Sequence, residues 1–294
     1  MFKNHDIPLL IDLLEKQEVK IYHACQLKDF RSYLKIGGIP SRQFLENMSL
    51  PFTQFASDKN DRVNGDWDKV FVNISDFGKF FGQGSIAVPN VYGPILFQLS
   101  PKILGEAVDV AVCLKSAGST GFCREDESLN SISDVERLFK EPNKPWAKKP
   151  QELQVEFDLA KKPSNPEISC TVEGSRLSLN FVELIRVDSY ALQSQTLTAF
   201  VKEIVSSSNW SFTKIYERDQ CPIFTKEIAN LLFEKGNPVK LSECINNGNI
   251  SQKFRSWTQE ISSQNLEYQF NNFINYLFEG TIVVMKEESN DSSF

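Results

Sequence analysis

Hydrophobic positions near the start of the chain change from the period of a strand to the period of a helix. Residues 20–24 carry closely spaced apolar side chains, which is typical of a buried strand. Residues 27–35 place leucine and phenylalanine at three- and four-residue spacing, which predicts a helix. Gly37 and Gly38 follow, and a glycine directly after a helix favours the positive φ that ends it. The segment therefore predicts a strand, a short turn and a helix with a glycine stop.

Similar patterns continue along the chain and predict a mixed layout of strands and helices up to about residue 218. Strands are predicted at 69–78, 95–99, 152–159, 181–188 and 210–217. Helices are predicted at 7–17, 131–141, 198–207, 223–236 and 256–280. Residues 104–122 fit a strand or a helix equally well. The polar end of the chain, EESNDSSF, is typical of a disordered tail.

The composition is that of an ordinary soluble globular protein. Of the 294 residues, 41% are hydrophobic and 24% are charged, and this length suits one large domain or one domain with an appendage. No apolar run approaches the roughly 20 residues that span a bilayer. The N-terminus lacks the long apolar core and the cleavage site of a signal peptide. We therefore expect a cytoplasmic protein with no membrane partner.

The net charge of −6 argues against a protein that coats nucleic acid by bulk charge. A local basic groove remains compatible with this charge, because four lysines cluster in one otherwise unremarkable loop. They are Lys140, Lys144, Lys148 and Lys149. The 23 phenylalanines indicate an aromatic-rich core, with surfaces that stack on bases as the less expected alternative.

The cysteines and histidines do not form a metal-binding pattern. None of the six cysteines belongs to a C-x-x-C pair, and the chain has only two histidines, so we expect reduced thiols and no metal. Cys25 and His23 lie two residues apart on a predicted strand, which would put them on one face. A catalytic pair is one interpretation, and a small buried thiol beside a hydrogen-bonded core histidine is the simpler one.

The stretch IYHACQLKDFRSYLKIGGIPS resembles the opening of the DarT-type ADP-ribosyltransferases, toxins that modify nucleic acid using NAD. That opening has I-Y-H, two further residues, a short apolar-patterned helix and a glycine-containing turn. The resemblance covers roughly residues 19–218, with specific motifs at His23 and Glu152. It implies an α+β fold with a split, mixed and mostly antiparallel sheet. Residues 1–218 would be the catalytic domain and residues 219–294 a mostly helical extension with a disordered tail.

The chemistry of ADP-ribosyl transfer calls for a carboxylate beside the ribose, because the transition state is positively charged there. Glu152 stands in KKPQELQV, which resembles the family's K-K-x-x-E-Φ-x-V context (Φ is apolar), and the resemblance implies that it is the catalytic acid. Glu156 lies four residues further along the same predicted strand and is the fallback. Without the resemblance, Glu152 is an exposed carboxylate at a strand edge.

Three further site residues are implied by the same resemblance. His23 matches a first-strand histidine that holds the NAD ribose or nicotinamide, and Tyr92 in PNVYGPILFQL would lie near the nicotinamide. Arg62 falls where the family has an arginine that contacts the cofactor and helps to activate the attacking group. The family often has two adjacent arginines, whereas Asp61 precedes Arg62 here, so a solvated loop charge is the competing interpretation.

The resemblance implies an NAD-dependent ADP-ribosyltransferase toxin that uses NAD as a substrate and needs no metal. Its acceptor would be a base of single-stranded DNA or RNA, since unpaired bases can be reached without flipping. Toxicity to the host cell implies an antitoxin or inhibitor partner, in a toxin–antitoxin or phage-defence system. Two alternatives stay open: a protein acceptor, which the acidic charge and an altered middle segment favour, and a non-catalytic binding protein on the same scaffold.

Overall fold

The computed structural model describes residues 1–53, 58–74, 76, 94–118, 121–139, 166–188, 191–192 and 195–218. Within these ranges nine strands form one sheet, eight of them in a continuous order. In that order the strands are β1 (Phe2–Lys3), β6 (Ala107–Cys113), β8 (Glu167–Val172), β4 (Val70–Asn73), β2 (Ile21–Cys25), β5 (Ile95–Leu99), β10 (Val182–Asp188) and β13 (Ile215–Arg218). The ninth, β7 (Ser128–Leu129), pairs with β6. All pairs are antiparallel except β10 with β13, so the sheet is mixed and mostly antiparallel.

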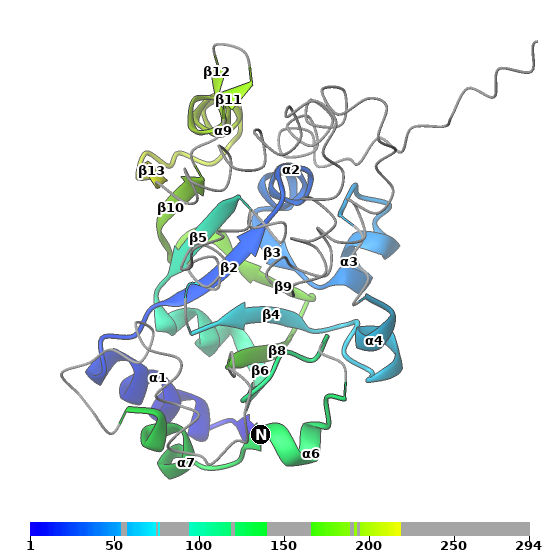
Figure 1. Ribbon diagram of the computed structural model, residues 1–294, viewed down its shortest axis with the longest axis vertical. Coiled ribbons are helices and arrows are strands. Elements are labelled where there is room, and N and C mark those ends of the chain that lie inside the picture. The colour runs from blue at the N-terminus through cyan, green and yellow to red at the C-terminus, as the bar shows by residue number, and fades with distance from the viewer. Residues whose placement is uncertain are drawn as a thin grey trace, which may run out of the picture.

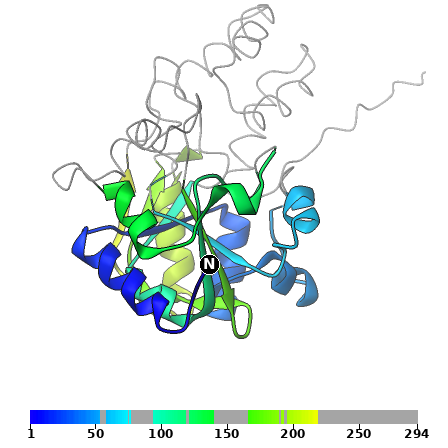
Figure 2. The same ribbon diagram turned by 90° about the horizontal axis from the view of Figure 1, so that it is seen from below.

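The helices lie on both sides and at one end of this sheet (Figure 1). They are α1 (Asp6–Lys16), α2 (Leu27–Ile36), α3 (Arg42–Asn47), α4 (Asp58–Val63), α6 (Arg124–Glu127), α7 (Ile132–Glu136) and α9 (Leu197–Ser206), with 3-10 turns at Pro101–Glu106, Arg137–Phe139 and Leu179–Phe181. Two small two-stranded sheets join β3 (Gly38–Pro40) to β9 (Arg176–Ser178) and β11 (Ala191–Leu192) to β12 (Gln195–Thr196). Helices α1 and α7 lie together near the N-terminus (Figure 2).

The large sheet is weakly joined between β2 and β4. In the described ranges these two strands pair at a single position, Tyr22 with Asn73. By contrast, β2 pairs with β5 from Ile21 to Cys25, and β4 pairs with β8 along its whole length. Figure 1 shows β2 and β4 running apart from their one point of contact. The sheet therefore consists of two halves, and we call the junction between β2 and β4 the seam.

Alternation along the strands separates an apolar face from a polar one. Every second residue of β4 and β8 is buried and apolar, as the pattern of a strand with one covered face requires. On the β2 side of the seam, helix α2 covers the sheet by stacking Phe30 on Phe97, with ring centroids 5.6 Å apart. Both rings are fully buried. Helix α2 therefore buries an aromatic pair against β5 on this half of the sheet.

The expected α+β class and the mixed, mostly antiparallel sheet are confirmed, and most predicted elements occur. The first predicted strand and helix are β2 and α2, and Gly37 ends the helix with a φ of 69°. Residues 104–122, left open between strand and helix, contain β6. Two predictions differ: β8 is a strand that the sequence analysis does not predict, and the last strand begins at Ile215 rather than Trp210, since residues 210–214 are not assigned to a strand.

The other predicted elements cannot be compared in this way. The strand at 152–159, the helices at 223–236 and 256–280 and the whole extension at 219–294 lie outside the described residues. No helix in the described part of the chain is long and apolar enough to cross a membrane.

Candidate functional site at the seam of the sheet

His23 occupies the seam and joins the two halves of the sheet through its side chain. Its Nδ1 lies 2.8 Å from the backbone carbonyl oxygen of Phe71 in β4, and its Nε2 lies 3.2 Å from the hydroxyl of Tyr33 in α2. A carbonyl oxygen can only accept, so Nδ1 carries the proton and donates to Phe71. Nε2 then accepts from the Tyr33 hydroxyl. The imidazole is held in one tautomer by partners from two different elements.

The surroundings of His23 keep it neutral. Burial, with a smaller contribution from the nearby Arg42 guanidinium, lowers the pKa of His23 to about 4, against the opposing effects of the Phe71 carbonyl and Asp29. At neutral pH the ring therefore offers one N–H donor and one lone pair. A neutral, fixed imidazole suits a group that binds or orients a hydroxyl rather than a general base with a pKa near 7.

A buried ion pair lies near the His23 ring, in the first turn of helix α2. Asp29, which is 1% exposed, accepts hydrogen bonds from Nη1 of Arg42 at 2.9 Å and from the backbone N–H of Thr53 at 3.0 Å. The Arg42 guanidinium also lies over the Phe52 ring, 5.4 Å from its centroid. Removing either charge would take a buried counter-charge away from the other, which is destabilising. The pair therefore fixes where α2 and α3 meet next to His23.

On the opposite face, a row of polar side chains crosses the seam. Tyr22 pairs with Asn73, and Asn73 pairs in turn with Glu167 at the start of β8. Residues directly opposite one another in a sheet project from the same face. Successive residues of a strand alternate, so Tyr22 and its row leave the sheet on the side away from His23. The seam therefore has the His23 imidazole on one face and the row of Tyr22, Asn73 and Glu167 on the other.

Glu167 is the carboxyl group of this row, and its pKa is shifted. Burial, with smaller contributions from Asp61 and Asp66, raises the pKa of Glu167 to about 7. The backbone N–H of Ala117, which donates to Oε1 at 2.8 Å, opposes the shift. Both protonation states are therefore populated at neutral pH, which is the property expected of a general acid or base.

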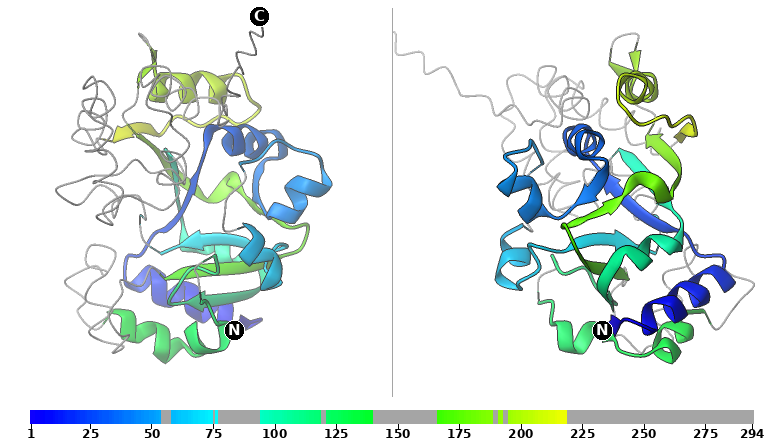
Figure 3. Two further views of the ribbon diagram at one scale, coloured as in Figure 1. Left: turned by 45° about the vertical axis from the view of Figure 1, so that its right-hand side comes forward. Right: turned by 180° about the vertical axis from the view of Figure 1, so that it is seen from behind.

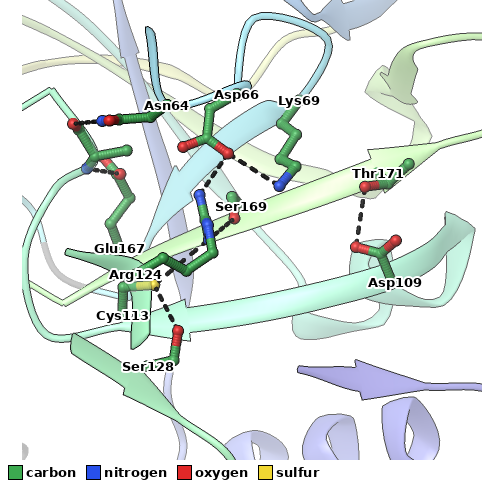
Figure 4. A network of polar contacts seen from close by, with 11 residues as sticks. Asn64, Asp66, Lys69, Asp109, Cys113, Arg124, Ser128, Glu167, Ser169 and Thr171 are labelled. Atoms are coloured by element: carbon green, nitrogen blue, oxygen red, sulfur yellow. Dashed lines mark hydrogen bonds and ion pairs between the residues drawn. The ribbon is translucent and has the colours of Figure 1, made fainter. Parts of the chain in front are cut away.

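A network of polar contacts supports the strand end that carries Glu167 (Figure 4). Asp66 is fully buried and is ion-paired with Lys69, at 2.9 Å, and with Arg124. Arg124 Nη1 also lies 3.4 Å from the Ser169 hydroxyl of β8 and 3.7 Å from the sulfur of Cys113 in β6. These contacts join the segment after α4, helix α6 and two central strands, so they hold β8 in place.

Arg62 takes part in a different arrangement on the surface. Its Nη2 donates to both carboxylate oxygens of Glu46, at 2.9 and 3.1 Å, and its guanidinium stacks 3.7 Å from the centroid of the Trp67 ring. The Trp67 indole N–H donates to the same carboxylate at 2.9 Å. About half of the Arg62 side chain is exposed. We call these three residues the Arg62 clamp, and a role of Arg62 at NAD stays a prediction.

The remaining candidates divide into those outside the described residues and one buried thiol. Glu152, its fallback Glu156 and Tyr92 lie outside the described residues, as do the four clustered lysines. Cys25 is 2% exposed, and burial raises the pKa of its thiol well above the ordinary value. A catalytic pair of Cys25 with His23 is not supported, because such a thiol does not ionise near neutral pH.

Sequence reasoning missed four residues beside the seam: Asp29, Tyr33, Arg42 and Glu167. The first three look like ordinary members of helices, and only the folded chain shows that a charge in α2 pairs with one in α3. For Glu167 a signal existed, because EISCTV alternates apolar and polar residues and contains β-branched side chains.

Comparison with known proteins gives a likeness of shape only. No protein-family model matches the chain, and no curated protein sequence matches it. Thermus sp. 2.9 DarT in complex with ADP-ribosylated ssDNA is 12% identical over 68% of this chain and 93% of that chain, with a TM-score of 0.41. The same protein in complex with NAD+ is 12% identical over 68% and 94%, with a TM-score of 0.39. Thermosipho africanus DarTG in complex with ADP-ribose is 12% identical over 70% and 51%, with a TM-score of 0.39. These values assign neither a residue nor an activity.

The raised pKa of Glu167 predicts a pH-dependent stability. The folded state keeps this proton up to about pH 7, whereas the ordinary value is 4.5, so the protein loses stability as the pH rises through this window. Glu167→Gln removes the loss. We expect its unfolding free energy relative to the unmodified protein to increase between pH 5 and pH 8, by at most about 3 kcal/mol. Urea unfolding at both pH values measures the difference.

Glu173→Gln is the matched control, because Glu173 is exposed directly after the same strand. It should leave the pH dependence of stability unchanged. A Glu167→Gln variant with the same pH dependence as the unmodified protein would show that the Glu167 carboxyl titrates normally.

Proposed function

We propose that the protein is an NAD-dependent ADP-ribosyltransferase that modifies a base of single-stranded DNA or RNA. The observation that carries the proposal is the position of His23. The histidine of the I-Y-H stretch that resembles the DarT-type enzymes is the residue that bridges the seam, neutral and fixed in one tautomer. Any buried imidazole needs hydrogen-bond partners, so the support comes from the match of this residue to the motif together with its place at the seam.

The transfer makes specific demands on the residues around the ribose. The bond between C1′ of the ribose and the nicotinamide nitrogen breaks, and nicotinamide leaves with the bonding electrons. A base of the acceptor attacks C1′ and loses a proton. A carboxylate stabilises the positive charge at C1′ and can take up this proton. The imidazole of His23 would hold a ribose hydroxyl through Nε2, in the place of the Tyr33 hydroxyl.

Two glutamates compete for the role of this carboxylate. The resemblance gives it to Glu152, in the motif before the predicted strand. The structure adds Glu167, which is buried in the row across the seam and has a pKa of about 7. We favour Glu152, because the side chain of Glu167 leaves the sheet on the face away from His23, the residue proposed to hold the ribose. Tyr92 and Arg62 remain proposed contacts to the nicotinamide and the cofactor.

The biological setting that we propose follows from the chemistry. Modified bases block replication or translation of the host, so such an enzyme requires an inhibitor, and we infer an antitoxin partner within a toxin–antitoxin or phage-defence system. A non-catalytic binding protein is the second candidate. The Arg62 clamp favours it, since the arginine expected at NAD is held by Glu46 and Trp67.

Transfer of a label from NAD tests the function. We expect labelled ADP-ribose on single-stranded nucleic acid rather than on protein, and at least a 100-fold lower rate for Glu152→Gln, since general acid–base groups contribute about 10²–10⁴-fold. Glu167→Gln runs in parallel and Glu173→Gln is the control. A larger loss of rate in Glu167→Gln than in Glu152→Gln would assign the role to Glu167 instead. No label on any acceptor, together with no NAD binding by calorimetry, would leave the binding protein.

A matched pair of variants tests Arg62. Arg62→Gln and Glu46→Gln both break the Arg62 clamp, but only the first removes the cation. If Arg62 contacts NAD, the affinity of the protein for NAD should fall about tenfold in Arg62→Gln, because a hydrogen bond to a charged group contributes about 1.5–3 kcal/mol. Glu46→Gln should bind NAD at least as well as the unmodified protein. Equal affinities in the two variants would restrict Arg62 to the clamp.

A further inference from the structure

A groove lies between helices α2 and α9, on the side of α2 that faces away from the seam. It encloses about 550 Å³, which is within the range of binding sites for small molecules and single nucleotides. The two helices lie beside each other at one end of the molecule (Figure 3). The groove is lined by Arg31, Leu34, Lys35, Phe200, Glu203, Ile204, Ser207, Ser208 and Asn209.

The α2 wall of the groove is basic. Arg31 and Lys35 are both exposed and stand one helical turn apart, so they project from the same face of α2. The Arg31 guanidinium lies over the Phe200 ring, 5.5 Å from its centroid. This stacking restrains the side chain while the guanidinium edge stays available for hydrogen bonds. Neither residue forms an ion pair with any carboxylate in the described part of the chain.

The α9 wall has the opposite character. It carries the carboxylate of Glu203 and the C-terminal end of α9, where helix carbonyl oxygens point outwards. The hydroxyls of Ser207 and Ser208 donate back to the carbonyl oxygens of Glu203 and Val205, so they do not supply donors to a ligand. The cations of the groove therefore lie on the α2 wall, which is the side where a phosphate would bind.

We propose that this groove binds the sugar–phosphate backbone of single-stranded nucleic acid, with Arg31 and Lys35 contacting successive phosphates. The inference rests on the proposed function, because it supplies a docking site for the acceptor strand. Helix α2 connects the two regions: its buried face presents Tyr33 to His23, and its exposed face presents Arg31 and Lys35 to the groove. A strand bound along α2 would thus be held one helix diameter from the seam. The two cations also explain how a chain of net charge −6 attracts a polyanion locally.

Binding of a labelled 12-nucleotide single strand, as DNA and as RNA, tests the groove by fluorescence anisotropy across a range of salt concentrations. In Arg31→Gln/Lys35→Gln, affinity should fall at least about tenfold. The slope of log affinity against log salt should shrink by about 1.4, because each phosphate contact on a single strand contributes about 0.7. The control Lys16→Gln/Lys202→Gln removes the same charge from exposed positions outside the groove, one of them on α9 itself.

The outcomes separate this inference from the proposed function. Consumption of NAD without acceptor should be equal in all three proteins, since the groove lies away from the seam. Unchanged affinity and salt slope in the double variant, or an unmodified protein that consumes NAD but binds neither strand, would overturn the groove assignment alone. Preference of the groove for poly-glutamate over both strands would overturn it as well. If NAD is neither bound nor consumed and the double variant still loses the strand, the groove assignment stands and the transferase proposal fails.

Discussion

The hydrogen bond from Nδ1 of His23 to the carbonyl oxygen of Phe71 is the contact on which the centre of the molecule depends. It lies where the ladder between β2 and β4 is reduced to one pair, so the side chain supplies a donor that the backbone does not. A buried carbonyl without a partner is destabilising by about 1–3 kcal/mol. Loss of the imidazole would therefore remove the side-chain link between β2 and β4 and the partner of the Tyr33 hydroxyl in α2.

Burial keeps the His23 imidazole neutral. On the other face of the sheet, burial shifts the pKa of Glu167 in the opposite direction. Burial lowers the pKa of His23 to about 4 and raises the pKa of Glu167 to about 7. Both shifts favour the uncharged form, because both groups are withdrawn from water. Groups whose pKa values are displaced by their surroundings mark candidate acid–base sites. The stability of the protein thus responds to pH through buried groups on both faces of the sheet.

The sequence predicts those parts of this arrangement that depend on neighbouring residues. Strand β2, helix α2 and its stop at Gly37 follow from local spacing, since each pattern is complete within a few residues. The contacts of His23 do not, because Phe71 lies 48 residues away and its carbonyl carries no sequence signal. The Arg62 clamp joins positions 16 residues apart and could not be read from the composition of its loop. Glu167 differs, because the alternation in EISCTV is a local signal for its strand, whereas the burial that shifts its pKa comes from distant segments.

The central claim is that His23 is neutral, protonated on Nδ1 and in contact with NAD, and nitrogen NMR of histidine-labelled protein tests it directly. The chain has only two histidines, and His5 is an internal reference because its side chain is exposed. At pH 7 the His23 ring should show the Nδ1–H tautomer, should not titrate until about pH 4, and should shift on addition of NAD while His5 does not. A His23 signal that titrates near the ordinary value of 6.5, or that ignores saturating NAD, would contradict the account.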